Sequence, residues 1–145
     1  MANPLSVKLK SLNRDLTFAA KGESGHWIML DSKQDIGGNG AASSPMELVL
    51  DALGGCTGLD TLSILKKKRT PFTHLEMDIK GERRDEHPKS FTHIHIHFTL
   101  YSTGGEKALR DLEHAAELSH EKYCSVAAML RNSVEITFDC EIIDE

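Results

Sequence analysis

Alternation of apolar and polar side chains dominates the first 31 residues. Short runs of this pattern occur around Val7, around Phe18 and from His26 to Leu30, and the last run follows the glycine-containing turn Lys21 to Gly25. Successive side chains of a strand point to opposite faces, so each run predicts a strand with one apolar face. We expect an N-terminal meander of two or three short strands.

A glycine-rich loop from Gln34 to Ser44 precedes the longest apolar segment of the chain. Ser44 suits a helix N-cap, Pro45 suits the first helical position, and Glu47 is placed to complete the start signal. The basic run Lys66 to Arg69 suits a helix C-terminus, before Thr70-Pro71 ends the pattern. Apolar residues occupy nearly every face of the first five turns, so we expect a long helix that is buried on most sides.

The second half of the chain predicts two strands, two helices and a last strand. The first two strands flank the polar turn Asp85 to Ser90 and form a hairpin over the long helix. An amphipathic helix is expected from Glu106 to His120, and a shorter one from Cys124 to Arg131. The last strand runs from Val134 to Ile142, with Cys140 on its apolar side.

Size and composition narrow the classes of function. A chain of 145 residues with 39% hydrophobic residues predicts one domain, residues 1–145. The net charge of -5 disfavours nucleic acid and anionic lipid as partners. Neither a secretory signal nor a charge-free membrane-spanning stretch is evident, so we expect a cytoplasmic protein without membrane contact. Three cysteines are too few and too uneven for a disulfide framework, which leaves inert core residues or thiol chemistry.

Two cysteine-containing segments resemble the signature regions of the OsmC/Ohr family. They are Ser44 to Cys56 and Glu121 to Ala127, and Ser90 to Ile94 also resembles a strand of that family. The resemblance runs from about Gly37 to the C-terminus. It implies an α+β fold with antiparallel strands wrapped around a long buried central helix, an intertwined homodimer, and thiol-dependent reduction of organic hydroperoxides.

The resemblance also implies roles for individual residues. Cys56 would attack the peroxide and become a sulfenic acid, Cys124 would resolve it as a disulfide, and an external dithiol would reduce the enzyme again. Glu47 matches the family's active-site glutamate. The family's peroxidases use an N-terminal arginine to activate the thiolate, where this chain offers only Arg14, in an unlike context; Arg83 or Arg84 is the best substitute.

The position of Cys56 inside the long helix limits how its thiol can be activated and which residues can reach it. A free cysteine is only a few per cent thiolate at neutral pH, and Cys56 lies too far inside the helix to be helped by its N-terminal dipole. Adjacent Gly54 and Gly55 predict that another group comes close to this turn. Glu47 and Cys56 are nine residues apart, about 13 Å along a regular helix and on opposite faces. Either the first turn is irregular or Glu47 serves the Cys56 of a partner subunit.

We also expect particular roles for Cys124, for Cys140 and for the residues that would contact the substrate. Cys124 lies at a helix start, where free N–H groups lower the pKa of a thiol. Cys56 and Cys124 could instead be small buried hydrophobes, as intracellular cysteines usually are, and Cys140 is expected to be structural. An apolar peroxide tail would contact residues such as Met46 and Leu53.

Alternate histidines on one strand, His93, His95 and His97, could chelate a metal. We expect instead an exposed polar face opposite Ile94 and Ile96, and neither a metal nor another cofactor. The loop from Gln34 to Gly40 lacks the Lys and Ser/Thr of a phosphate-binding loop.

Two functions compete. The first is a homodimeric hydroperoxide reductase; the second is a redox-sensing or ligand-binding dimer of the same fold with little peroxidase activity. An Arg or Lys beside Cys56 would favour the first. In a third, purely structural interpretation, both cysteine segments only pack the core, and alkylating agents do not modify Cys56 or Cys124 in the folded protein.

Overall fold

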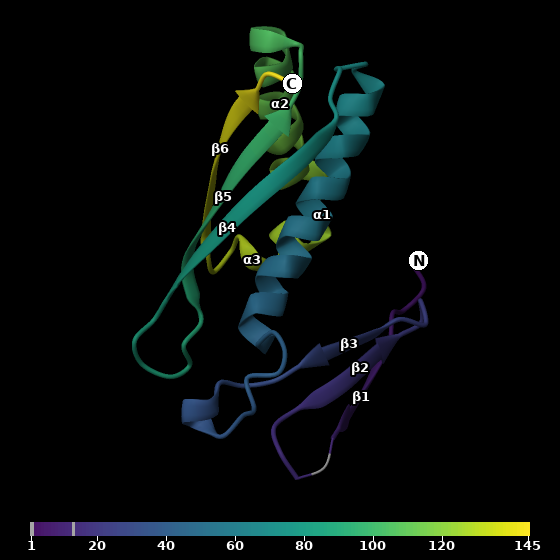
Figure 1. The fold of residues 1–145 in the computed structure, drawn as a ribbon. Coiled ribbons are helices and arrows are strands. Elements are labelled where there is room, and N and C mark those ends of the chain that lie inside the picture. The colour runs from purple at the N-terminus through teal and green to yellow at the C-terminus, as the bar shows by residue number, and fades with distance from the viewer. Residues whose placement is uncertain (1, 13) are drawn as a thin grey trace. The chain divides into compact units, whose positions relative to one another are not determined.

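The computed structural model describes residues 2–12 and 14–145, which fall into two compact units, Met1–Val49 and Leu50–Glu145 (Figure 1). Helix α1 (Pro45–Lys67) begins in the first unit and continues into the second. Each unit carries one three-stranded sheet. The fold is α+β, as the sequence predicts, and the expectation of a single domain stays a prediction.

The first unit holds the N-terminal meander. Strands β1 (Val7–Ser11), β2 (Phe18–Gly22) and β3 (Trp27–Leu30) pair antiparallel in the order β1-β2-β3, which confirms the predicted strands. The loop after β3 contains a short 3-10 turn, η1 (Gln34–Ile36).

The buried carboxylate of Asp31 organises that loop. It accepts backbone N–H groups from Ser32 at 2.7 Å and Ala41 at 3.0 Å, and also from Asn39. Burial alone would raise the pKa of Asp31, but these N–H donors outweigh it and lower the pKa. The loop before α1 is therefore held by one side chain.

Most apolar side chains of the meander are exposed in the single chain. Ala19 and Ala20 are buried, whereas Trp27 is 53% exposed. The other exposed apolar side chains on the strands are Val7, Leu9, Phe18, Ile28 and Met29. Soluble proteins rarely leave many large apolar side chains of one small sheet open unless they contact a partner.

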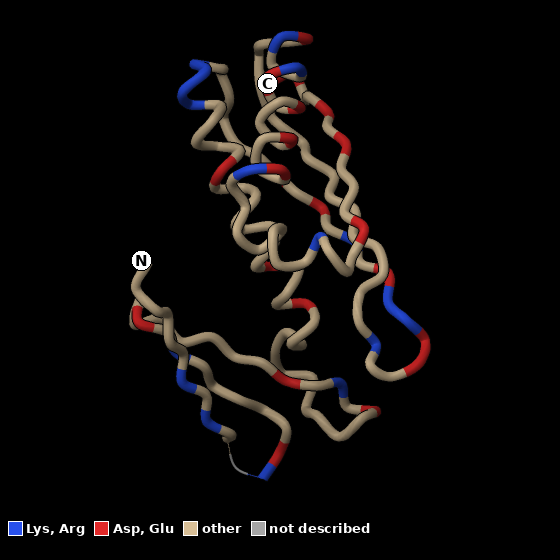
Figure 2. The backbone as a smooth tube through the Cα atoms, turned by 180° about the vertical axis from the view of Figure 1, so that it is seen from behind, with Lys and Arg blue, Asp and Glu red and all other residues tan. Residues whose placement is uncertain are grey.

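Helix α1 has well-formed ends. Ser44 Oγ accepts the N–H of Glu47 at 3.2 Å, and the Glu47 carboxylate accepts the N–H of Ser44 at 2.6 Å, which forms a reciprocal capping box at the predicted helix start. At the other end Arg69 is left-handed (φ 59°), and the N–H of Thr70 reaches the carbonyl of Leu65 across 3.1 Å. Lys66 and Lys67 add positive charge to the last turn of α1. Figure 2 shows where basic and acidic residues lie along the chain.

Only one face of α1 is buried. The buried positions are Leu53, Gly54, Thr57, Gly58, Thr61 and Leu65. Leu59, on another face, is 73% exposed. The expectation of burial on most sides is therefore wrong for the single chain, because one sheet covers one side of the helix. By length and composition α1 could also cross a membrane, a test that the core helices of soluble proteins pass as well; 22% of its apolar window is buried.

The glycines of α1 allow close packing on the sheet of the second unit. A Cβ on Gly54 would collide with the side chain of Ile79, and one on Gly58 would lie 3.1 Å from the sulfur of Met77. No atom of the described residues lies within 4 Å of such a Cβ on Gly55. The predicted close approach is thus confirmed for Gly54, and the approaching group is a strand side chain.

The second sheet combines a hairpin with a parallel strand. Strands β4 (His74–Arg83) and β5 (Phe91–Tyr101) pair antiparallel, as predicted. Strand β6 (Glu135–Ile143) pairs parallel to β5. The expectation of antiparallel strands is wrong here, since the helical connection between β5 and β6 carries the chain back to the same end of the sheet before β6 starts.

That connection supplies the rest of the core. It consists of α2 (Gly105–Leu118), a π-helical turn η2 (Ser119–Tyr123) and α3 (Ser125–Leu130). The core includes the buried apolar side chains Ile94, Ile96, Phe98 and Leu100 of β5, Ala108, Leu112, Ala115 and Ala116 of α2, and Leu53 and Leu65 of α1. These three elements converge on one core.

Candidate thiol site

The second unit brings Cys56 and Cys124 together. Cys56 comes from the middle of α1, and Cys124 is the N-cap residue of α3. Their sulfur atoms lie within 4.8 Å of each other, and both cysteines are free. A disulfide requires about 2.05 Å between the two sulfurs, so the side chains must move closer together before a bond can form.

Cys124 is the enclosed member of the pair, with 2% of its surface exposed. Its sulfur accepts the hydroxyl of Thr57 at 3.4 Å and the N–H of Ala127 at 3.3 Å. Burial nevertheless raises the pKa of the Cys124 thiol, because the loss of hydration outweighs these two donors. The helix start was predicted correctly, but the prediction of a lowered pKa is wrong.

Cys56 is half-buried, and a carboxylate lies beside it. Asp60, one turn further along α1, has a carboxylate oxygen within 4.8 Å of both sulfurs. Ser119 donates its hydroxyl to Asp60 Oδ2 at 2.9 Å and so orients the group. Sequence reasoning missed Asp60, although its spacing of four residues from Cys56 places both on one helix face.

Three arginines were predicted as candidate activators of Cys56. Arg83 and Arg84 make contacts at the end of the β4–β5 hairpin, and Arg14 belongs to the first unit. The Arg83 guanidinium donates from Nε to the carbonyl of Lys89 at 2.7 Å, at the base of the hairpin end. The backbone N–H of Arg84 pairs with Ser90 in the same turn. Among the described residues of the second unit, no hydrogen bond or ion pair joins Arg83 or Arg84 to Cys56.

The other predicted site residues all lie in α1; they are Met46, Glu47 and Leu53. The N–H and then the hydroxyl of Ser44 lower the pKa of Glu47, which belongs to the regular first turn of α1. An irregular first turn therefore does not explain how Glu47 could serve Cys56. Leu53 is fully buried in the core and Met46 is half-buried, so contact of these two with substrate stays a prediction.

Cys140 lies apart from this pair, half-buried on the apolar side of β6 as predicted. Burial, followed by the charges of Glu113 and Asp139, raises its pKa to about 12. Almost none of this thiol is ionised at neutral pH, which agrees with a structural role.

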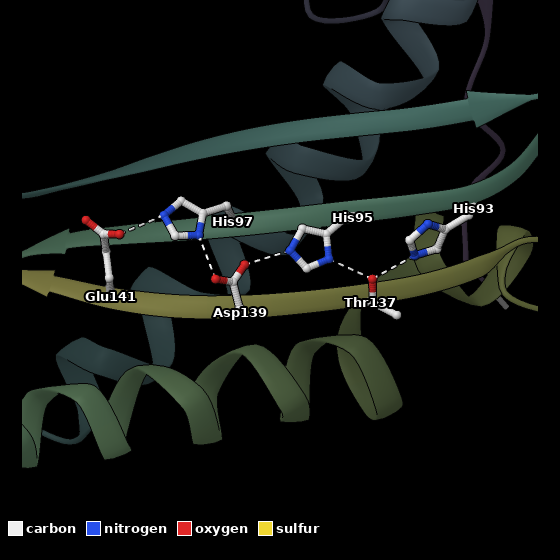
Figure 3. Close-up of polar contacts among 6 residues, drawn as sticks. All are labelled: His93, His95, His97, Thr137, Asp139 and Glu141. Atoms are coloured by element: carbon white, nitrogen blue, oxygen red, sulfur yellow. Dashed lines mark hydrogen bonds and ion pairs between the residues drawn. The ribbon is translucent and has the colours of Figure 1, made fainter.

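The three histidines of β5 form a hydrogen-bonded ladder with β6 (Figure 3). His93 and His95 both contact the hydroxyl of Thr137, at 2.8 and 2.7 Å. Asp139 bridges His95 at 2.6 Å and His97 at 2.9 Å, and Glu141 lies 3.0 Å from the other nitrogen of His97. The ladder occupies the face opposite the buried Ile94 and Ile96, as predicted.

This ladder is not arranged as a chelate. In residues 2–12 and 14–145, one group of three His, Cys, Asp or Glu donors has all of its ligand atoms within 4.8 Å of one another, and that group is Cys56, Asp60 and Cys124. The compact donor set of the molecule is therefore the thiol site.

The chain is similar to known proteins over most of its length. Residues 37–139 match the model of the OsmC-like protein family. The chain is 44% identical to the protein YhfA of Escherichia coli K12 over 128 residues, 88% of this chain and 91% of YhfA. A crystal structure of a hypothetical protein from Aquifex aeolicus is 36% identical, with a TM-score of 0.84 and 99% of both chains covered.

A more distant structure shares the fold alone. The organic hydroperoxide resistance protein OsmC of Legionella pneumophila is 15% identical, with a TM-score of 0.70, 97% of this chain covered and 98% of that protein. The family match and the YhfA similarity both cover most of the chain and include both cysteine segments. The chain therefore belongs to the OsmC-like protein family.

Proposed function

We propose that this protein is a thiol-dependent peroxidase that reduces organic hydroperoxides to alcohols. The observation that carries the proposal is the proximity of two reduced thiols, Cys56 and Cys124, whose sulfurs lie within 4.8 Å. The hydroperoxide resistance protein of Legionella pneumophila, which has the same fold, supports the reaction class.

The reaction balances with these two thiols and one external reductant. The Cys56 thiolate attacks the terminal oxygen of ROOH, the O–O bond breaks, and the alkoxide leaves as ROH after taking up a proton. Cys56 is then a sulfenic acid. The Cys124 thiolate attacks its sulfur, water leaves, and a disulfide forms, which an external dithiol reduces to two thiols.

The surroundings of the cysteines support this division of roles. Cys56 is half-buried and can be reached by a substrate, whereas Cys124 is enclosed and its thiol has a raised pKa. The donors of Thr57 and Ala127 are placed to stabilise a Cys124 thiolate when it attacks. Cys140, with a pKa of about 12, contributes to neither step.

The second candidate is a redox-sensing or ligand-binding dimer with little peroxidase activity, and Asp60 favours it. A carboxylate within 4.8 Å of both sulfurs opposes the accumulation of negative charge there. An efficient peroxidase needs a compensating cation at Cys56. In our proposal that cation, like Glu47, comes from another part of the assembled protein.

We further propose an intertwined homodimer that works in the cytoplasm. The exposed apolar side chains of β1 to β3 and of α1, Trp27 and Leu59 among them, need a cover that the single chain does not provide. A second copy would supply it, and would allow Glu47 of one subunit to serve Cys56 of its partner.

Product analysis tests the reaction. The reduced protein is mixed with cumene hydroperoxide and excess dithiol, and the alcohol is quantified. We expect turnover far above that of free dithiol, loss of turnover in Cys56→Ser, and full turnover in Cys140→Ser. A rate no greater than that of free thiol would reject the peroxidase and leave the sensing or binding dimer.

A further inference from the structure

We propose that the reduced cluster of Cys56, Asp60 and Cys124 is also a binding site for a thiophilic divalent cation such as Zn²⁺. Two thiolates and one carboxylate would bind the ion, and the fourth position would hold water. The inference depends on the geometry of the cluster, not on peroxidase activity, so the two proposals can fail separately.

The spacing of the donors suits such an ion. The two sulfurs and one carboxylate oxygen lie within 4.8 Å of one another. Zinc binds thiolate at about 2.3 Å and carboxylate at about 2.0–2.2 Å in tetrahedral geometry, which separates the ligand atoms by about 3.3–3.8 Å. To reach these separations from the observed spacing, the two sulfurs and the carboxylate oxygen must move by about 1 Å, which side-chain rotation allows.

The scaffold fixes the donors before any ion arrives. Cys56 and Asp60 lie four residues apart on one face of α1, and Cys124 caps α3. Ser119 holds Oδ2 of Asp60 at 2.9 Å, which leaves Oδ1 for a ligand bond. Hydrogen-bonded carboxylates and thiolates of this kind are typical of protein metal sites.

The charges also favour a cation. In the bound state the two thiolates and the Asp60 carboxylate supply three negative charges to the cation. A divalent ion offsets two of these charges and releases the two thiol protons to solvent. Soft thiolate donors select ions such as Zn²⁺ and Cd²⁺ over Mg²⁺ or Ca²⁺.

A cavity adjoins the Asp60 carboxylate. Asp60 lines a cavity of about 260 Å³ together with Ser63, Ile64, Lys67, Leu118 and Tyr123. The histidine ladder offers no comparable cluster, because its carboxylates already bridge the imidazoles. An ion bound at the thiols would occupy the electron pairs that attack a peroxide, and would therefore block oxidation of the pair.

Titration of the reduced full-length protein with Co²⁺, under anaerobic conditions and with a phosphine reductant, tests the site. We expect one ion per chain, an intense thiolate-to-cobalt charge-transfer band, the visible bands of tetrahedral Co²⁺, and the release of about two protons per ion. Zn²⁺ should displace Co²⁺ and bleach these bands. Binding without the charge-transfer band would overturn the proposal.

Variants locate the ion. Cys56→Ser should weaken binding and halve the charge-transfer intensity per bound ion, and Ser119→Ala should weaken binding about tenfold through the carboxylate it orients. Asp60→Asn, at a half-exposed position, should weaken binding more than Ser119→Ala does. Cys140→Ser and His97→Gln, both outside the cluster, should bind as the wild type does. Unchanged binding in Cys56→Ser, or loss of binding in Cys140→Ser or His97→Gln, would contradict the site.

Discussion

Thr57 donates its hydroxyl to the sulfur of Cys124 across 3.4 Å, and this contact joins the middle of α1 to the start of α3. The donor lowers the pKa of a thiol that burial raises, so it favours the anion that must attack the oxidised Cys56. We therefore expect Thr57→Val to lengthen the lifetime of the Cys56 sulfenic acid by about three- to tenfold, as measured by trapping with dimedone.

Thr61, one turn further along α1, provides the matched control. It is also fully buried, but its hydroxyl has no hydrogen-bond partner among the described residues. Thr61→Val should leave the sulfenic acid lifetime unchanged and should raise the free energy of unfolding by about 1 kcal/mol, because an unpaired buried hydroxyl is removed. Equal lifetimes in the two variants would show that the Thr57 contact has no chemical role.

The three cysteines should differ in their rates of alkylation. Cys56 is half-buried, Cys124 is enclosed, and Cys140 has a pKa of about 12. We expect iodoacetamide at pH 8 to modify Cys56 first and Cys140 least, as peptide mass spectrometry would show. Protection of all three in the folded protein would support a structural role for both cysteine segments instead.

The histidine ladder should make stability depend on pH in a defined window. Hydrogen bonding to Asp139 raises the pKa of His97 above 6.5, so its contribution is complete below 6.5 and is lost as the pH rises through the raised pKa. Hydrogen bonding to His97 lowers the pKa of Asp139 below 3.8, so its contribution is complete above 3.8 and is lost as the pH falls through the lowered pKa.

The effect of Asp139→Asn on the free energy of unfolding should therefore be largest between about pH 4 and 6.5. Because these side chains are partly exposed, we expect a difference below about 1 kcal/mol. Chemical denaturation across pH 3 to 9 measures it, and Glu135→Gln, on the same strand but outside the ladder, is the control. A difference that is constant over this range would exclude the ladder as its source.

The capping box separates two roles of Glu47. Ser44→Ala removes the hydroxyl that caps α1 and should lower the free energy of unfolding by about 1 kcal/mol without changing peroxide turnover. Glu47→Gln keeps an acceptor for the N–H of Ser44 but removes the charge, so it should reduce turnover if Glu47 serves the thiol of a partner. If both variants retain full turnover, Glu47 is only a helix cap.

Local patterns predicted the elements well. The alternation around Val7 and Phe18 gave the strands, and the Ser44, Pro45 and Glu47 signal gave the start of α1, because these features depend on neighbouring residues alone. The placement of Cys124 at a helix start was right for the same reason.

Long-range features were not predictable in this way. The pKa of Cys124 depends on how much of the chain covers it, and the parallel pairing of β6 depends on where the α2–α3 connection returns. Asp60 shares a helix face with Cys56 in the sequence, but so do many pairs four residues apart. Only the position of α3 shows that this pair meets Cys124.

The proposed reaction requires that Cys56 and Cys124 form one redox pair. Its most direct test is to treat the reduced protein with one equivalent of cumene hydroperoxide, count the remaining thiols, and map the linked peptides by mass spectrometry. The redox pair requires loss of two thiols per chain, a Cys56–Cys124 disulfide, and a sulfenic acid on Cys56 in Cys124→Ser. Retention of all three thiols, or a disulfide that includes Cys140, would contradict it.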